Sequence, residues 1–368
     1  MKALVAGAGA VGSWVGGALA AGGADVTLVA RGAHGAAMAE SGLTLRGVGG
    51  GWSVHTRPRV VARVAEAVAA APFDVALVAV KSYDTAGVAA ELAASAVSRC
   101  VVSLQNGVGN EAVLEEHLPG CAVAPATLTT GVAIAAPGVV AGGRKGGVGV
   151  APAVGATGVP AGSPADASGA PPAPILAELV ARLAVAGLDA RLYPDGAALK
   201  WSKLLLNMLG NATCAILAWP PDRAFRDPRV FAIEHAAWRE AVAVMRALGI
   251  RPVALPGYPV DVYARVGTAL PTRWLFALAH RSLARARGSR LPGVVADLAA
   301  GRPRSEVEVL NGAVVRAGAR AGVATPVNRV LVDLVVELAA GRLPRRSFAD
   351  RPEALAAAVH AGRWPAEG

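Results

Sequence analysis

A glycine pattern near the start of the chain places the strongest limit on the fold. The stretch "MKALVAGAGAVGSWVGGALAAGGADVTLVAR" has apolar runs at 3–6 and 25–30, with a small-residue segment between them that suits a helix. Glycines in G-x-G-x-x-G spacing between a strand and a helix predict a dinucleotide-binding unit of a Rossmann-type α/β domain. The alternative is a glycine turn with a structural role only. The predicted cofactor loop consists of Gly7, Ala8, Gly9, Ala10, Val11 and Gly12.

The residue after the second predicted strand indicates which nicotinamide cofactor is bound. An NAD enzyme usually places Asp or Glu there, to bind the ribose diol. Here the residue is Arg31, followed by Gly32, and a guanidinium suits a 2′-phosphate. The sequence therefore favours NADP(H) over NAD(H), against the alternative that Arg31 is ordinary surface charge.

Two further apolar runs end in polar residues. The run 74–80 ends at Lys81, and the run that begins at Cys100 ends at Asn106. Ligands of open α/β sheets lie beyond the carboxyl ends of the strands, so both residues are candidates for contacts with cofactor or substrate. The alternatives are a solvated lysine and an Asn-Gly turn.

The segment "KWSKLLLNMLGN" carries an unusual row of polar residues. Lys203, Asn207 and Asn211 are each four residues apart, which places them on one face of an α-helix. The residues between them are mostly apolar, which favours a buried helix with a functional polar row. The alternative is a helix face turned to solvent.

The chain length of 368 residues predicts two domains, at 1–197 and 198–368. The first contains a low-complexity segment at about 151–174, expected to be a flexible insertion. The second is expected to be all-helical, with amphipathic helices at 231–250, 271–287, 305–322 and 325–341.

Composition excludes several classes of function. The net charge is +10, but the arginines are scattered and are not interleaved with aromatic residues, so we expect no nucleic-acid partner. Cys100, Cys121 and Cys214 form no metal or disulfide motif. We expect no metal, no membrane span and a cytoplasmic location, with a homodimer as a possible assembly through the helical half.

Five motifs in order resemble the ketopantoate reductases (2-dehydropantoate 2-reductases). They are "GAGAVG", "VAVKSYDT", "LQNGVGNE", "KWSKLLLNMLGNATCAI" and "SEVEVLNGAVVRAGARAGVATPVN". The resemblance spans nearly the whole chain except 151–174 and a longer helical stretch around 270–292. It implies a Rossmann domain, a helical domain similar to that of 6-phosphogluconate dehydrogenase, and NADPH-dependent reduction of ketopantoate in pantothenate and coenzyme A synthesis.

The resemblance also implies roles for single residues. Lys203 matches the lysine that protonates the keto oxygen, and it binds substrate together with Asn207 and Asn211. Asn106 matches a contact to both cofactor and substrate. Lys81 and Glu306 match contacts to the cofactor. An alternative for Glu306 is a helix start capped by Ser305, where a carboxylate favours the helix dipole.

Two positions depart from the family pattern. Pro221 stands where the family often has a substrate-binding asparagine, and Gly293, four residues before Asp297, replaces a serine. Proline has no N–H to donate. These departures keep open a reductase of a different 2-oxo acid or related ketone. A non-catalytic NADP(H)-binding protein is a separate alternative, and the presence of Lys203, Asn207, Asn211, Asn106 and Glu306 together argues against it.

Overall fold

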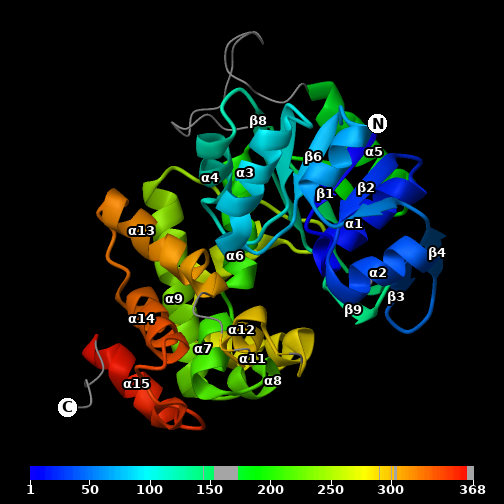
Figure 1. Ribbon diagram of the computed structural model, residues 1–368. Coiled ribbons are helices and arrows are strands. Elements are labelled where there is room, and N and C mark those ends of the chain that lie inside the picture. Colours follow the sequence, from blue (N-terminus) through cyan, green and yellow to red (C-terminus); the bar gives the residue numbers. More distant parts are fainter. Residues whose placement is uncertain (144, 153–172, 290, 300, 302–304, 363–368) are drawn as a thin grey trace. The chain divides into compact units, whose positions relative to one another are not determined.

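The computed structural model describes residues 1–143, 145–152, 173–289, 291–299, 301 and 305–362. The chain forms two compact units (Figure 1). The first contains Met1–Gln105, Gly109–Lys203 and Ala254–Tyr258, and the second contains Asn106–Val108, Leu204–Val253 and Pro259–Gly368. Most of the expected insertion, residues 153–172, lies outside the described residues.

An eight-stranded sheet forms the centre of the first unit, in the order β12-β11-β8-β7-β6-β1-β2-β5. The six strands from β8 to β5 pair in parallel, and β11 pairs antiparallel with β8. From β1 the chain continues to β2 on one side and later to β6 on the other, a reversal of strand order that creates a ligand-binding edge. The strands are β1 (Lys2–Ala6), β2 (Asp25–Val29), β5 (Arg59–Val61), β6 (Val75–Val78), β7 (Cys100–Ser103), β8 (Ala122–Leu128), β11 (Val148–Val150) and β12 (Ala190–Leu192).

Side chains of the central strands alternate between two apolar cores, as expected for a sheet covered on both faces. Val5 packs in one core with Trp14 and Leu183 of the helices α1 (Ala10–Ala21) and α5 (Ala173–Val185). Leu4 packs in the other with Leu92 of α3 (Thr85–Ser95) and with α4 (Asn110–His117). The remaining elements are α2 (Gly32–Ser41), η1 (Val64–Ala70) and η2 (Ser82–Asp84).

A second, four-stranded sheet was not predicted from the sequence. Its order is β4-β3-β10-β9. Short length and partial exposure explain why: three residues of β9 are exposed, and no regular apolar alternation marks the strand. The strands are β3 (Leu43–Gly47), β4 (Ser53–Thr56), β9 (Val132–Ala136) and β10 (Val139–Gly142).

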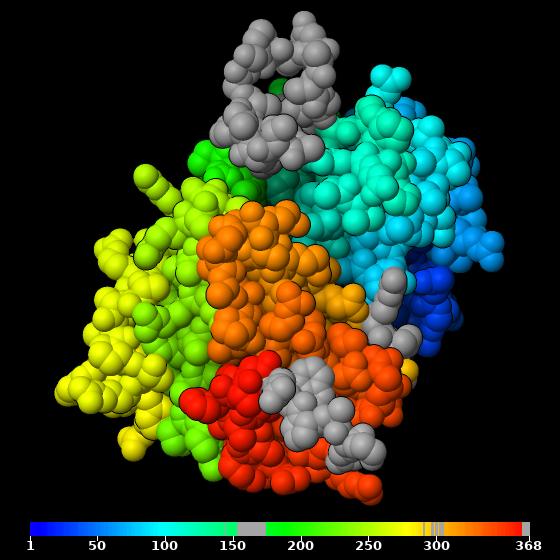
Figure 2. Space-filling model, turned by 90° about the vertical axis from the view of Figure 1, so that its left-hand side faces the viewer, coloured from blue at the N-terminus to red at the C-terminus, as the bar shows by residue number. Residues whose placement is uncertain are grey.

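The second unit is helical and is organised around α9 (Pro228–Ala247). Asp227 caps this helix by accepting the backbone N–H groups of Arg229 and Val230, and Pro228 occupies its first turn. The helices α14 (Pro326–Ala339) and α15 (Pro352–Ala361) pack on each other, and together with α13 (Asn311–Ala321) they form the orange to red surface in Figure 2. The other elements are α7 (Asn211–Leu217), α8 (Pro221–Ala224), α10 (Val260–Ala269), α11 (Thr272–Arg287), α12 (Gly293–Ala299), η3 (Glu306–Glu308) and η4 (Arg345–Ser347).

The predicted fold class, a Rossmann-type α/β domain followed by a helical domain, is confirmed. Three of the four predicted helices match α9, α11 and α14 closely. In the fourth, Ser305 caps only the short turn η3, by accepting the N–H of Val307, and the α-helix itself begins at Asn311. No helix among the described residues is both long and apolar enough to cross a membrane.

Candidate active site

The loop between β1 and α1 contains glycines with different physical roles. Gly7 has φ +98°, and a Cβ there would lie 2.8 Å from the backbone nitrogen of Val80. A Cβ on Gly12 would lie 2.3 Å from the carbonyl oxygen of Gly7. Gly9, by contrast, is exposed, and a Cβ there would meet no protein atom within 4 Å. Packing therefore requires Gly7 and Gly12, whereas Gly9 leaves an open cradle at the start of α1.

This cradle fits the pyrophosphate of a dinucleotide. Gly9 is the N-cap of α1 and has no side chain to cap it. The first N–H groups of a helix have no carbonyl partner within the helix, and they carry the positive end of its dipole. The residues present thus match the chemistry of an anionic group at this point.

Arg31 and Lys81 follow neighbouring parts of the same sheet. Arg31 is exposed, lies two residues beyond the end of β2 and is the N-cap of α2. Lys81 is half-buried and lies three residues beyond Val78, the last residue of β6. Asn106 lies three residues beyond Ser103, which pairs with Val78. These positions agree with the strand ends expected from the sequence.

Two lysines lie on helix α6 (Gly196–Asn207), and their surroundings differ. Lys200 is 5% exposed, with its ammonium 2.9 Å from Glu111 Oε1 and 2.6 Å from the carbonyl oxygen of Gln105. Lys203 is half-buried, one turn before Asn207. The ammonium of Lys200 is thus held within the protein, and Lys203 is the lysine of this helix for which the family motif predicts contact with substrate.

The expectation of one helix carrying Lys203, Asn207 and Asn211 is wrong for its last member. Helix α6 ends at Asn207, and α7 begins at Asn211. Gly210 has φ +76° at the break, and its N–H donates to Glu234 Oε2 over 2.9 Å. The buried carboxyl therefore holds a turn that the four-residue spacing did not predict.

The asparagines nevertheless lie together in the second unit. Asn207 Nδ2 donates to Asn106 Oδ1 over 2.9 Å, and Asn211 Nδ2 donates to the carbonyl oxygen of Asn207. The residues after Asn106 pack on the turn that follows half-buried Glu306, where the N–H of Val108 donates to the carbonyl of Val309 over 3.1 Å. Residues 101 positions apart in sequence thus belong to one polar cluster, named here the asparagine cluster (Asn106, Asn207 and Asn211).

Sequence reasoning missed Glu234, which supports this cluster. The residue lies in the middle of α9, is 4% exposed, and accepts the hydroxyl of Thr213 as well as the N–H of Gly210. Burial raises the pKa of its carboxyl, while the two hydrogen bonds oppose the shift. The sequence does contain a sign of this role, since a glutamate stands on the apolar face of the helix α9. An acidic residue is rarely buried without a partner.

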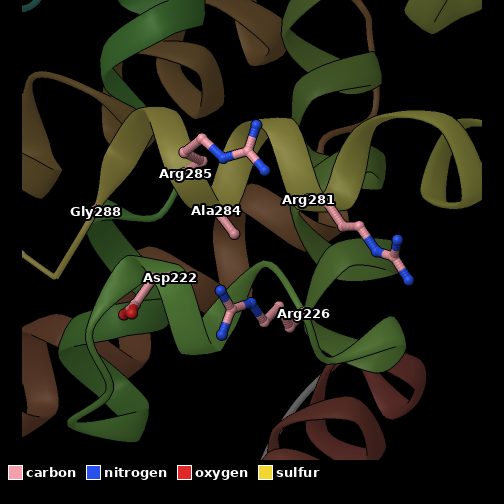
Figure 3. Close-up of a pocket in the computed structure, with 6 residues that line it drawn as sticks. All are labelled: Asp222, Arg226, Arg281, Ala284, Arg285 and Gly288. Carbon is pink, nitrogen blue, oxygen red and sulfur yellow. The ribbon is translucent and has the colours of Figure 1, made fainter.

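A separate cavity of about 380 Å³ lies in the helical unit, and Figure 3 shows three arginines around it. Arg281 and Arg285 come from α11, and both are exposed. The lining residues are Asp222, Arg226, Arg281, Ala284, Arg285 and Gly288. None of them is a predicted cofactor or substrate residue, so the cavity is not assigned to the site.

Sequence profiles of the ketopantoate reductase PanE/ApbA family match residues 3–153, and the profile of its C-terminal part matches 196–339. The chain belongs to the ketopantoate reductase family. A 2-dehydropantoate 2-reductase of Halobacterium salinarum is 32% identical over 338 residues, which cover 91% of this chain and 98% of that protein. A second, from Archaeoglobus fulgidus, is 30% identical over 332 residues, covering 90% and 95%.

Solved structures agree with this family. A PanE/ApbA family ketopantoate reductase of Ralstonia eutropha superposes with a TM-score of 0.70 at 30% identity, covering 93% of this chain and 99% of that one. D-mandelate dehydrogenase with NADH and anilino(oxo)acetate reaches 0.68 at 21% identity, a likeness of fold alone. This ketopantoate reductase family member is an oxidoreductase that works with a nicotinamide cofactor.

Substitution of the glycines should separate cofactor binding from folding. We expect Gly9→Ala to leave the melting temperature unchanged and to weaken NADPH binding, because the added methyl group enters the open cradle. Gly12→Ala is the matched comparison, since its methyl group meets the carbonyl of Gly7 and should lower stability by about 1–3 kcal/mol. Calorimetric titration with NADPH and thermal unfolding measure the two effects. Undiminished NADPH affinity in Gly9→Ala would contradict the assignment.

Glu234 should make stability depend on pH. Burial raises the pKa of Glu234 above its ordinary value of 4.5 in the folded protein. Protonation of this carboxyl therefore stabilises the fold, fully at pH values below 4.5. This stabilisation is lost as the pH rises through the pKa of the folded protein. Glu234→Gln keeps the shape but has no proton to lose. Relative to this variant, the wild-type free energy of unfolding should fall with rising pH, by at most about 1.4 kcal/mol per pH unit. Urea unfolding across pH measures this, and parallel curves would contradict it.

Proposed function

We propose that this family member reduces a 2-oxo acid with NADPH, by default ketopantoate to pantoate. The observation that carries the proposal is the arrangement on and beside α6. Half-buried Lys203 lies one turn before Asn207, whose amide is 2.9 Å from Asn106. An amine and carboxamides on an otherwise apolar helix suit a substrate that has a keto oxygen and a carboxylate.

The residues of the first unit suit the binding of NADPH. The backbone of the loop 7–12 would hold the pyrophosphate, and the guanidinium of Arg31 would pair with the 2′-phosphate. Lys81 is proposed as a further cofactor contact on the strength of its family motif, and so is Glu306 of the second unit. When bound, the reduced nicotinamide supplies a hydride to the keto carbon of the substrate.

Lys203 is proposed as the proton donor. Hydride addition to a ketone builds negative charge on the carbonyl oxygen, and a positioned ammonium stabilises that charge and delivers a proton to it. The alcohol product forms, and the lysine is left as a neutral amine that regains a proton from solvent. Lysine suits this step better than arginine, because the guanidinium holds its proton too tightly.

The asparagine cluster is proposed to bind the substrate. A carboxamide has two N–H donors and one acceptor oxygen. The bond to Asn106 uses one of the two N–H donors of Asn207. Amide donors can bind a carboxylate or hydroxyl without adding charge. The link from Asn211 to the backbone of Asn207 holds the third amide beside the other two.

A reductase of a different 2-oxo acid is the second candidate, favoured by Pro221 and Gly293. Pro221 is buried in the first turn of α8, and Gly293 begins α12. Neither residue has a side chain that can form a hydrogen bond. Loss of a buried polar partner costs about 1–3 kcal/mol, which is enough to change substrate preference.

Replacement of Lys203 tests whether the protein is an enzyme or a non-catalytic NADP(H)-binding protein. We expect Lys203→Ala to lower kcat for ketopantoate by about 100-fold to 10,000-fold, as for loss of a general acid, while NADPH binds with unchanged affinity. Absorbance of NADPH and fluorescence titration measure these two quantities. Lys145→Ala, at an exposed lysine, is the matched control. Equal turnover in wild type and Lys203→Ala would contradict the assigned role.

A further inference from the structure

Lys200 is fully engaged inside the first unit. Its ammonium donates to the carbonyl oxygen of Gln105 over 2.6 Å and lies 3.5 Å from that of Ala126. Glu111 Oε1 is 2.9 Å away, in the geometry of an ion pair rather than an aligned hydrogen bond. An ammonium has three donors, and three acceptors surround this one. The side chain therefore joins helix α6 to the segment that follows β7, to β8 and to α4.

Gln105 extends this connection to the next strand. Its side-chain Nε2 donates to the carbonyl oxygen of Val80 over 3.2 Å and to the hydroxyl of Thr85 over 2.7 Å. The hydroxyl of Thr85 donates in turn to the carbonyl oxygen of Ser82 over 2.7 Å. Val80 and Ser82 are the two neighbours of Lys81 in the chain. The backbone on both sides of that lysine is thus tied to Gln105.

We propose that Lys200 is a positioning residue for the reductase reaction. Through Gln105 it holds the backbone around Lys81 and the residue that leads directly into Asn106. On its own helix it anchors the turn that precedes Lys203. One buried ammonium thereby fixes the backbone origins of three residues assigned to cofactor and substrate, and this inference rests on the proposed function.

The charges explain why a lysine suits this place. A buried ammonium is unfavourable unless it is paired and hydrogen-bonded, and Lys200 has both kinds of partner. An apolar side chain would fill the space, but it would leave the carbonyl of Gln105 without this donor and the carboxylate of Glu111 without its cation. A buried ion pair adds little net free energy to folding, so we infer that this one serves to favour one arrangement of the surrounding backbone.

Two variants separate positioning from stability. Lys200→Met removes the donor and leaves Glu111 uncompensated, so both melting temperature and kcat should fall. Adding Glu111→Gln removes the stranded charge and should restore much of the melting temperature. The carbonyl of Gln105 still lacks its donor, so kcat should stay about 100-fold low in both variants, as expected for misplacement of reacting groups by about 1 Å.

A third variant and a control complete the test. Gln105→Met leaves Lys200 in place but cuts the bonds to Val80 and Thr85, so it should also lower kcat, and it decides the matter if Lys200→Met fails to fold. Leu183→Ala, on the buried face of α5, should lower the melting temperature without lowering kcat. In Lys200→Met and in Gln105→Met, NADPH deuterated at the transferred hydrogen should show a larger isotope effect on kcat than in wild type.

The outcomes distinguish this inference from the proposed function. A wild type that turns over no 2-oxo acid with NADPH contradicts the proposed function. An active wild type overturns the positioning role if kcat recovers together with melting temperature in the double variant, or if Gln105→Met keeps full kcat. Low kcat with restored melting temperature supports it.

Discussion

Parallel pairing of strands buried on both faces is the constraint on which the rest of the first unit depends. Because β1, β2, β6 and β7 run in the same direction, their carboxyl ends meet at one edge of the sheet. The glycine loop, Arg31, Lys81 and Gln105 all follow those ends directly. Alternation of apolar side chains fixes the register, since a slip of one residue would exchange the two cores. The residues proposed to contact the cofactor are therefore placed by the packing of the sheet.

Helix α6 lies in a largely apolar environment, and its two lysines have different surroundings. At Lys200 the charge is neutralised inside the protein by Glu111 and by backbone carbonyls. One turn later Lys203 is half-buried, and it is proposed to act on the substrate. The helix then stops, and Glu234 holds the turn at Gly210 that starts α7 at Asn211. The position of the Asn211 amide is thus set by a turn that a buried carboxyl holds, and not by one continuous helix.

Local patterns predicted the parts of the site that depend on local structure. The glycine spacing identified the loop after β1, and the four-residue spacing correctly placed Lys203 and Asn207 on one helix. The break before Asn211 escaped prediction because it depends on Glu234, which lies 24 residues away from Gly210. The contacts of Lys200 escaped for the same reason: Gln105 is 95 positions distant. The small second sheet has short, half-exposed strands with no periodic signal.

A direct comparison of substrates tests the proposed reduction of ketopantoate. The measurement is kcat/KM for NADPH oxidation by the wild-type protein with ketopantoate and a small panel of other 2-oxo acids, repeated with NADH. We expect the highest value for ketopantoate with NADPH, which would show that Pro221 and Gly293 are tolerated by the substrate site. Tight NADPH binding with little turnover of ketopantoate and efficient turnover of another 2-oxo acid would contradict it. That result would direct attention to the surroundings of Pro221 and Gly293.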